Sequence, residues 1–211
     1  MTAADAFMTA FTACPLVAVL RGIRPDDVEA VGSALIAAGI RILEVPLNSP
    51  EPYASITRLS ALAGTDAIVG AGTVLDVEAV GRVAAAGGTL VISPSTDVDV
   101  ITATIAAGLV SVPGFFTPSE AFAAIRAGAH ALKFFPAEAG SPAVLKAMKA
   151  VLPRAIPVLA VGGMTPDGIG AWKAAGADGF GLGTALFTPG VTAAAAGEMA
   201  ARFVAAVGGA G

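Results

Sequence analysis

The segment Ala127-Gly128-Ala129-His130-Ala131-Leu132-Lys133-Phe134 contains a pattern that recurs along the chain: an alanine-rich helix end, a glycine, and a short β-rich run. Glycine closes a helix through a left-handed turn, so each copy predicts a helix end followed by a strand. Further copies begin at Ala38-Gly39, Ala86-Gly87, Ala107-Gly108 and Ala175-Gly176.

Pairs of a hydroxyl residue and proline mark where several helices are expected to begin. The hydroxyl can cap the first turn, and proline suits the first helical position. One segment, Thr117-Pro-Ser-Glu120, also has the spacing of a capping box. The pairs are Ser49-Pro50, Thr117-Pro118, Ser141-Pro142, Thr165-Pro166 and Thr188-Pro189.

Between these marks the sequence predicts eight strands that alternate strictly with helices. Such alternation implies parallel strands joined by crossover helices, and eight units predict a single (β/α)8 TIM barrel domain over residues 1–211. A short amphipathic helix around Phe7, Met8 and Phe11 is expected to precede it. A doubly wound open sheet is the alternative, although no G-x-G-x-x-G motif opens an early helix. The expected strands lie near 16–20, 41–46, 67–71, 89–93, 109–112, 130–135, 156–161 and 178–182.

Composition argues against several kinds of partner. The net charge of -4 and the lack of a basic cluster disfavour nucleic acid. Two long uncharged stretches, Val100 to Ser119 and Gly179 to Gly197, contain proline and glycine and are expected to form strand-turn-helix pieces rather than membrane spans. The N-terminus does not have the pattern of a secretory signal, and the single Cys14 cannot form an internal disulfide. We therefore expect a cytoplasmic protein.

Lys133 is the most informative residue for function. The other three of the four lysines lie in alanine-rich helical segments, whereas Lys133 lies in an apolar strand between leucine and phenylalanine. Burial there should lower its pKa from roughly 10.4, because desolvation disfavours the charged amine. A neutral buried amine can attack a ketone and form a Schiff base. The alternative is a lysine paired to a carboxylate for packing alone.

In a barrel, the carboxyl ends of the strands carry the active site. Glu44 and Lys133 should both point inward there and form an acid–base pair, unless Glu44 only offsets the lysine charge as a buried ion pair. Arg21 and Thr73 are candidates to bind a carboxylate. Glycine-rich turns after the last two strands suggest a phosphate site, formed by Gly162, Gly163, Gly183 and Thr184.

The remaining polar residues indicate neither a metal nor a cofactor. His130 begins a strand at the end opposite the expected site and is interpreted as structural. The chain has no Cys-x-x-Cys pair, no second histidine and no cluster of inward carboxylates, so we expect no catalytic metal. The sequence predicts no organic cofactor either.

Taken together, four segments resemble the 2-keto-3-deoxy-phosphogluconate/phosphogalactonate aldolase family. They are Leu43-Glu44-Val45, Gly70-Ala-Gly-Thr-Val-Leu75, Leu132-Lys133-Phe-Phe-Pro136 and Gly162-Gly163. The resemblance implies a trimeric class I aldolase that acts on a phosphorylated keto-deoxy sugar acid. It further implies that Lys133 forms the Schiff base, that Glu44 transfers protons, and that Phe135 packs over the imine carbon.

Within that family the chain resembles the phosphogalactonate branch, which implies release of pyruvate and glyceraldehyde 3-phosphate. The segments that carry this are Leu20-Arg-Gly-Ile23, Val45-Pro-Leu-Asn-Ser-Pro50 and Ala160-Val-Gly-Gly163. Gluconate-type members usually carry arginine at the position of Asn48 and threonine at that of Val161. The resemblance therefore implies that Arg21 supplies the carboxylate-binding cation, and that Val161 influences preference at C4.

Three other interpretations stay open at this point. The first is a phosphogluconate or 4-hydroxy-2-oxoglutarate aldolase. The second is another phosphate-binding barrel enzyme, which would share the glycine turns without needing Lys133. The third is a non-catalytic binding or assembly protein built on a barrel, which would not need Glu44 and Lys133 together.

Overall fold

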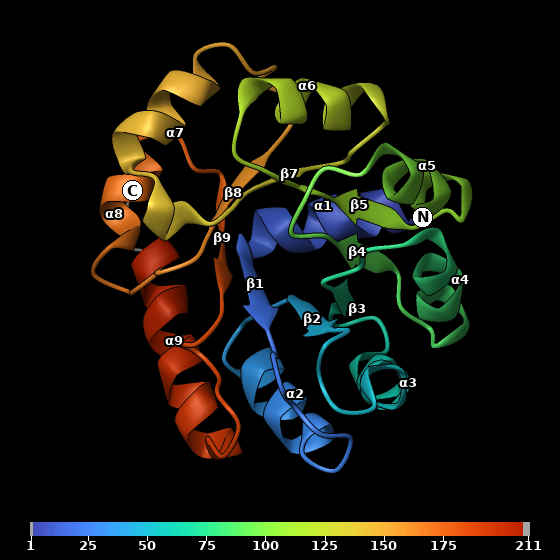
Figure 1. The fold of residues 1–211 in the computed structure, drawn as a ribbon. Helices are drawn as coiled ribbons and strands as arrows, with labels where there is room; N and C mark the ends of the chain where they lie inside the picture. Colours follow the sequence, from blue (N-terminus) through green and yellow to red (C-terminus); the bar gives the residue numbers. More distant parts are fainter. Residues whose placement is uncertain (1, 209–211) are drawn as a thin grey trace.

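The computed structural model describes residues 2–208, which form a barrel of parallel strands surrounded by helices (Figure 1). The strands are β1 (Leu16–Val19), β2 (Ile42–Pro46), β3 (Ile68–Gly72), β4 (Leu90–Ile92), β5 (Val110–Val112), β6 (Gly114–Phe115), β7 (Leu132–Phe134), β8 (Val158–Val161) and β9 (Gly179–Leu182). The helices are α1 (Ala3–Ala13), α2 (Val28–Ala37), α3 (Pro52–Ala63), α4 (Val77–Ala85), α5 (Val98–Ala106), α6 (Pro118–Arg126), the 3-10 helix η1 (Ala137–Ala139), α7 (Pro142–Lys149), α8 (Ile169–Ala174) and α9 (Ala193–Gly208).

The predicted TIM barrel is confirmed, with one strand divided in two. The strand order β5-β4-β3-β2-β1-β9-β8-β7-β6 leaves β5 and β6 at its two ends, and these are consecutive in the chain. Pro113 separates them, since proline has no N–H to donate to a ladder. Its carbonyl still accepts a 2.9 Å hydrogen bond from the N–H of Lys133. The fifth strand therefore joins β4 through one half and β7 through the other, which closes the barrel.

Two of the five predicted helix starts are confirmed and three are wrong. Thr117 and Ser141 cap α6 and α7, and Thr117 forms the full capping box with Glu120. The other three pairs lie in turns that precede α3, α8 and α9. Ser49, for example, accepts a hydrogen bond at Oγ from the N–H of Gly22 instead of capping a helix. A hydroxyl before proline favours a turn as well as a helix start, so this pattern does not separate the two.

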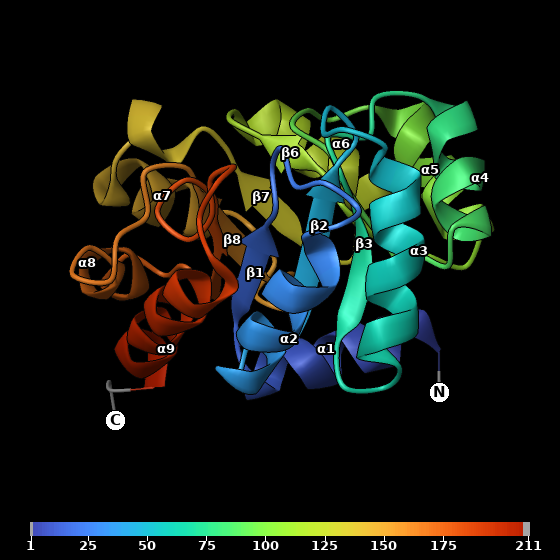
Figure 2. The same cartoon turned by 90° about the horizontal axis from the view of Figure 1, so that it is seen from below.

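Helix α1 covers the amino-terminal end of the barrel (Figure 2). Its Phe7 and Phe11 rings stack with centroids 5.6 Å apart and pack among strand side chains inside the barrel. Gly179 makes room for this contact, since a Cβ there would lie 2.6 Å from the Phe11 ring. The bottom of the barrel is thus filled with apolar side chains, and its opposite end is left for the polar residues.

The two uncharged stretches divide into short elements, as expected. Residues 100–119 contain the end of α5, both halves of the fifth strand and the start of α6, and residues 179–197 contain β9 and the start of α9. Among residues 2–208, no helix combines the length and the apolar character needed to cross a bilayer.

Candidate active site

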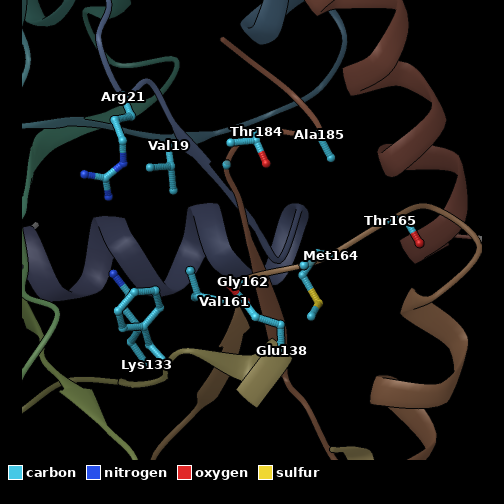
Figure 3. Close-up of a pocket in the computed structure, with 13 residues that line it drawn as sticks. Val19, Arg21, Lys133, Glu138, Val161, Gly162, Met164, Thr165, Thr184 and Ala185 are labelled. Atoms are coloured by element: carbon cyan, nitrogen blue, oxygen red, sulfur yellow. The ribbon is translucent and has the colours of Figure 1, made fainter. Parts of the chain in front are cut away.

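A pocket of about 660 Å³ opens at the carboxyl ends of β1, β7, β8 and β9 (Figure 3). It brings together eight of the ten residues that the sequence predicts for the site. Lys133 and Arg21 extend into it from opposite sides. The eight are Arg21, Lys133, Phe135, Val161, Gly162, Gly163, Gly183 and Thr184.

Lys133 lies in the middle of β7 and is only 5% exposed. Burial lowers its pKa, Arg21 lowers it further, and the charge of Glu44 acts in the opposite direction. The Nζ atom lies 4.6 Å from the centroid of the Phe135 ring. The structure thus places a partly desolvated amine at the inner end of the pocket, as the sequence predicted.

Glu44 lies on β2 and is 2% exposed. Burial raises the pKa of its carboxyl to about 7, even though Lys133 and Arg21 both favour the charged form. Its Oε2 atom is buried and has no hydrogen-bond partner among the described residues. A carboxyl group with such a pKa can give and take a proton near neutral pH.

Glu44 and Lys133 do not form a contact ion pair. Within residues 2–208, the ion pairs shorter than 4.0 Å join Arg58 to Asp26 and Lys149 to Asp178. Instead, Glu44 and Lys133 share the lining of an apolar cavity of about 10 Å³, roughly the space that one water molecule needs. The purely structural alternative, in which Glu44 neutralises the lysine by direct pairing, therefore lacks its contact.

Arg21 follows β1 and is tied to the neighbouring loop. Its Nη1 donates a 3.0 Å hydrogen bond to Oδ1 of Asn48, so both side chains lie at the rim of the site. Thr73 does not line the main pocket. It has a φ of 56° and lines a separate hollow of about 610 Å³, which Asn48 also lines. The Arg21–Asn48 hydrogen bond thus joins one lining residue of each hollow.

The glycine turn after β8 contacts a carboxylate. Gly162 and Gly163 have φ values of 113° and 68°, a region that favours glycine. Glu138, on η1, places Oε2 where a side chain at Gly162 would lie. Gly162 thus permits the close approach that was predicted for an anion, and in this structure the anionic group is a side chain of the protein itself.

Residues 2–208 contain no group of three His, Cys, Asp or Glu side chains that could hold a metal ion. His130 precedes β7, where its Nδ1 accepts a 3.1 Å hydrogen bond from the N–H of Ser111. Burial lowers its pKa, so the neutral form that accepts this bond is favoured. These contacts agree with the structural interpretation of the histidine.

Comparison with known proteins gives one consistent result. The family model for KDPG and KHG aldolases matches residues 8–201. The chain belongs to the KDPG and KHG aldolase family. It is therefore a lyase of the class I, Schiff-base type.

Three of the most similar proteins refine this placement. A 2-dehydro-3-deoxy-6-phosphogalactonate aldolase of Escherichia coli (strain K12) is 44% identical over 92% of this chain and 94% of its own. A solved structure described as native KDPGal has a TM-score of 0.91 at 44% identity, and the match covers 92% of this chain and 95% of that chain. A 2-dehydro-3-deoxy-phosphogluconate aldolase of Pseudoalteromonas atlantica is 39% identical over 67% of this chain and 64% of its own.

Five residues of this aldolase's pocket were not predicted from the sequence, and Glu138 is the most consequential of them. Its signal was present, because it follows the Lys133 strand in a loop at the catalytic end of the barrel. An exposed carboxylate in a loop is common, however, and nothing local indicates that it reaches the turn after β8. The others are Val19, Met164, Thr165 and Ala185.

Proposed function

We propose that this aldolase cleaves 2-dehydro-3-deoxy-6-phospho-D-galactonate to pyruvate and D-glyceraldehyde 3-phosphate. The observation that carries the chemistry is the buried amine of Lys133, which shares a small apolar cavity with the carboxyl of Glu44, whose pKa burial raises. The 44% identity to a phosphogalactonate aldolase, against 39% over a shorter span to a phosphogluconate aldolase, supports the substrate.

In the proposed reaction Lys133 attacks the C2 ketone, and loss of water gives a protonated Schiff base. This cation accepts the electron pair of the C3–C4 bond as that bond breaks. Glu44, directly or through one water, removes the proton from the C4 hydroxyl, which becomes the aldehyde of the departing product. Proton return to C3 of the enamine and hydrolysis of the imine release pyruvate and regenerate the amine.

The two ends of the substrate would be bound by different parts of the rim. We assign the carboxylate to Arg21, with Thr73 as a second donor from the neighbouring hollow. We assign the phosphate to the turns at Gly162-Gly163 and Gly183-Thr184. Phe135 lies beside the amine and would exclude water from the imine.

Reductive trapping tests the role of Lys133. Pyruvate and borohydride should add a single adduct to this residue, and Lys133→Met should abolish both the adduct and turnover. Lys146→Met, which changes an exposed lysine on α7, serves as the matched control and should react normally. An adduct on another lysine, or turnover by the Lys133 variant, would contradict the proposal.

Glu44→Gln tests the proton transfer separately. This variant should still form the trapped adduct, while turnover falls by roughly 10²-fold or more, because only the acid–base group is lost. Normal turnover would show that Glu44 has only a structural role, and it would not contradict Schiff-base formation by Lys133.

A phosphogluconate or 4-hydroxy-2-oxoglutarate aldolase is the second candidate, favoured by the wider family and by the 39% relative. Cleavage rates on the two C4 epimers, measured side by side, separate the candidates. We expect faster cleavage of the galactonate epimer, and a shift toward the gluconate epimer in Val161→Thr. Equal rates for both epimers would show that Val161 does not determine the preference at C4.

We further propose that the chain forms a homotrimer in the cytoplasm. Four large apolar side chains are well exposed at the start of consecutive helices or in the loops before them, after β3, β4 and β6. They are Leu75, Val77, Val98 and Phe116, with exposed fractions of 57%, 50%, 48% and 37%. Such a set on one side of the barrel mouth suits burial between subunits. Light scattering should give three times the mass of one chain.

A further inference from the structure

Gly72 ends β3, next to the strand that carries Glu44. A Cβ built on Gly72 would overlap the Glu44 carboxyl group. Its three nearest neighbours would be Oε2, Cδ and Oε1 of that one side chain. The space beside Gly72 is therefore the space in which the carboxyl group lies.

The backbone gives no other reason for glycine at this position. Gly72 is not among the glycines with positive φ, so its conformation suits an alanine. Gly70, on the same strand, differs in kind. A Cβ there would overlap the main-chain carbonyl of Leu90 on β4, so that glycine is required by the sheet itself.

Hydrogen bonds hold both sides of the space in place. The carbonyl of Gly72 accepts a 2.8 Å hydrogen bond from the N–H of Leu47, and the carbonyl of Glu44 accepts one of 2.9 Å from the N–H of Leu20. The first bond fixes the end of β3 against the segment after β2, and the second fixes Glu44 against the segment after β1. The Glu44 side chain, in contrast, has rotatable bonds and could point toward the open pocket if its present place were filled.

We propose that Gly72 is a positioning residue, whose missing side chain forms the slot that holds the Glu44 carboxyl group inside the barrel beside Lys133. This inference rests on the proposed role of Glu44 as the proton-transfer group. An alanine would displace the carboxyl group rather than the backbone, because the overlapping atoms are the far end of a flexible side chain. The displaced group would lie nearer the pocket opening and farther from its place beside the amine.

Gly72→Ala gives the direct test. Turnover should fall by roughly 10- to 100-fold, as is typical when a catalytic group is misplaced by about 1 Å. Reductive trapping with pyruvate should persist, because Lys133 is untouched. The acid limb of the kcat/KM profile, which reports the free enzyme and is expected near pH 7 for the buried carboxyl, should move to lower pH as Glu44 becomes hydrated. Unchanged turnover with an unchanged profile would overturn the proposal.

A double-mutant comparison excludes a purely structural role. In the Glu44→Ala background the carboxyl group is gone, so adding Gly72→Ala should leave the residual activity unchanged and should not lower the unfolding midpoint. An equal loss of stability in both backgrounds would show that Gly72 serves the sheet and would overturn the proposal. Normal turnover of Glu44→Ala alone would instead refute the catalytic role of Glu44, while the stability comparison would still test the slot.

Discussion

At the scale of single residues, two ionisable side chains inside an apolar barrel lower the stability of the folded state. Within residues 2–208 neither Lys133 nor Glu44 gains a contact ion pair. Burial raises the pKa of Glu44 and lowers that of Lys133, so the neutral form of each is favoured. A buried charge without a direct partner destabilises a fold, because water no longer solvates it. The same shifts make the amine nucleophilic and the carboxyl able to exchange protons near pH 7, so the cost and the chemistry have one cause.

Glu44 should make stability depend on pH. Its pKa is about 7 in the folded chain, compared with an ordinary value of 4.5, so the folded state binds the proton more tightly. Stability should then fall as the pH rises from about 4.5 to about 7. We expect Glu44→Gln to be more stable than the wild type by about 3 kcal/mol at pH 8, and equally stable below pH 4. Urea unfolding across this range measures the difference.

The control for this prediction is Glu198→Gln, which changes an exposed carboxylate on α9. Its stability should follow the wild type at every pH. If Glu44→Gln also followed the wild type, the pKa of Glu44 would not be raised by burial.

Glu138 should influence the binding of phosphate. Its carboxylate lies against the Gly162 turn, so an anion there would meet a like charge in a partly solvated place. We expect Glu138→Gln to lower KM for the phosphorylated substrate by about two- to tenfold, as removal of one screened repulsion would. In the condensation direction, KM for an aldehyde without phosphate should not change. A raised KM would show that the carboxylate instead accepts hydrogen bonds from the substrate.

At the scale of single elements, α1 is the helix that covers the amino-terminal end of the barrel. Phe7 is fully buried, whereas Met8, on the next position of the same helix, is 39% exposed. The barrel strands alone would leave an apolar opening at this end, and the two stacked rings of α1 fill it. The helix therefore contributes core packing although it lies outside the repeating strand–helix units.

Phe7→Ala should lower the free energy of unfolding by about 3–5 kcal/mol, because it removes a fully buried ring from the core. Met8→Ala should change it by about 0.5 kcal/mol or less. Denaturant titration of both variants tests this. A small effect of Phe7→Ala would mean that α1 can detach without loss of the barrel.

The helices and strands also show which local features could be predicted from sequence patterns and which could not. Helix ends at glycine were predictable because a left-handed residue is a local requirement that few other residues meet. Helix starts at Ser49, Thr165 and Thr188 were predicted wrongly, since the same residues suit turns. The break at Pro113 was not foreseen, although proline in a strand is a known reason for interruption.

At the scale of the whole molecule, closure of the barrel joins the first and last units directly through β1 and β9. We propose that residues 1–211 form one domain and therefore unfold in a single cooperative transition. Fluorescence of Trp172, on α8, and far-ultraviolet circular dichroism should give coincident midpoints. Separate midpoints would indicate two independently folding parts.

The sequence by itself determined the alternation of strands and helices, the barrel, and the identity of Lys133 and Glu44 as its unusual inward residues. These follow from periodicity and glycine placement, which act within a few residues of the chain. Tertiary structure alone decided that Glu44 and Lys133 lie close without pairing, that Thr73 faces a separate hollow, and that Glu138 reaches Gly162. It also decided that Gly72 leaves space for a carboxyl group. Each of these depends on strand register and barrel closure, which bring side chains from distant segments together.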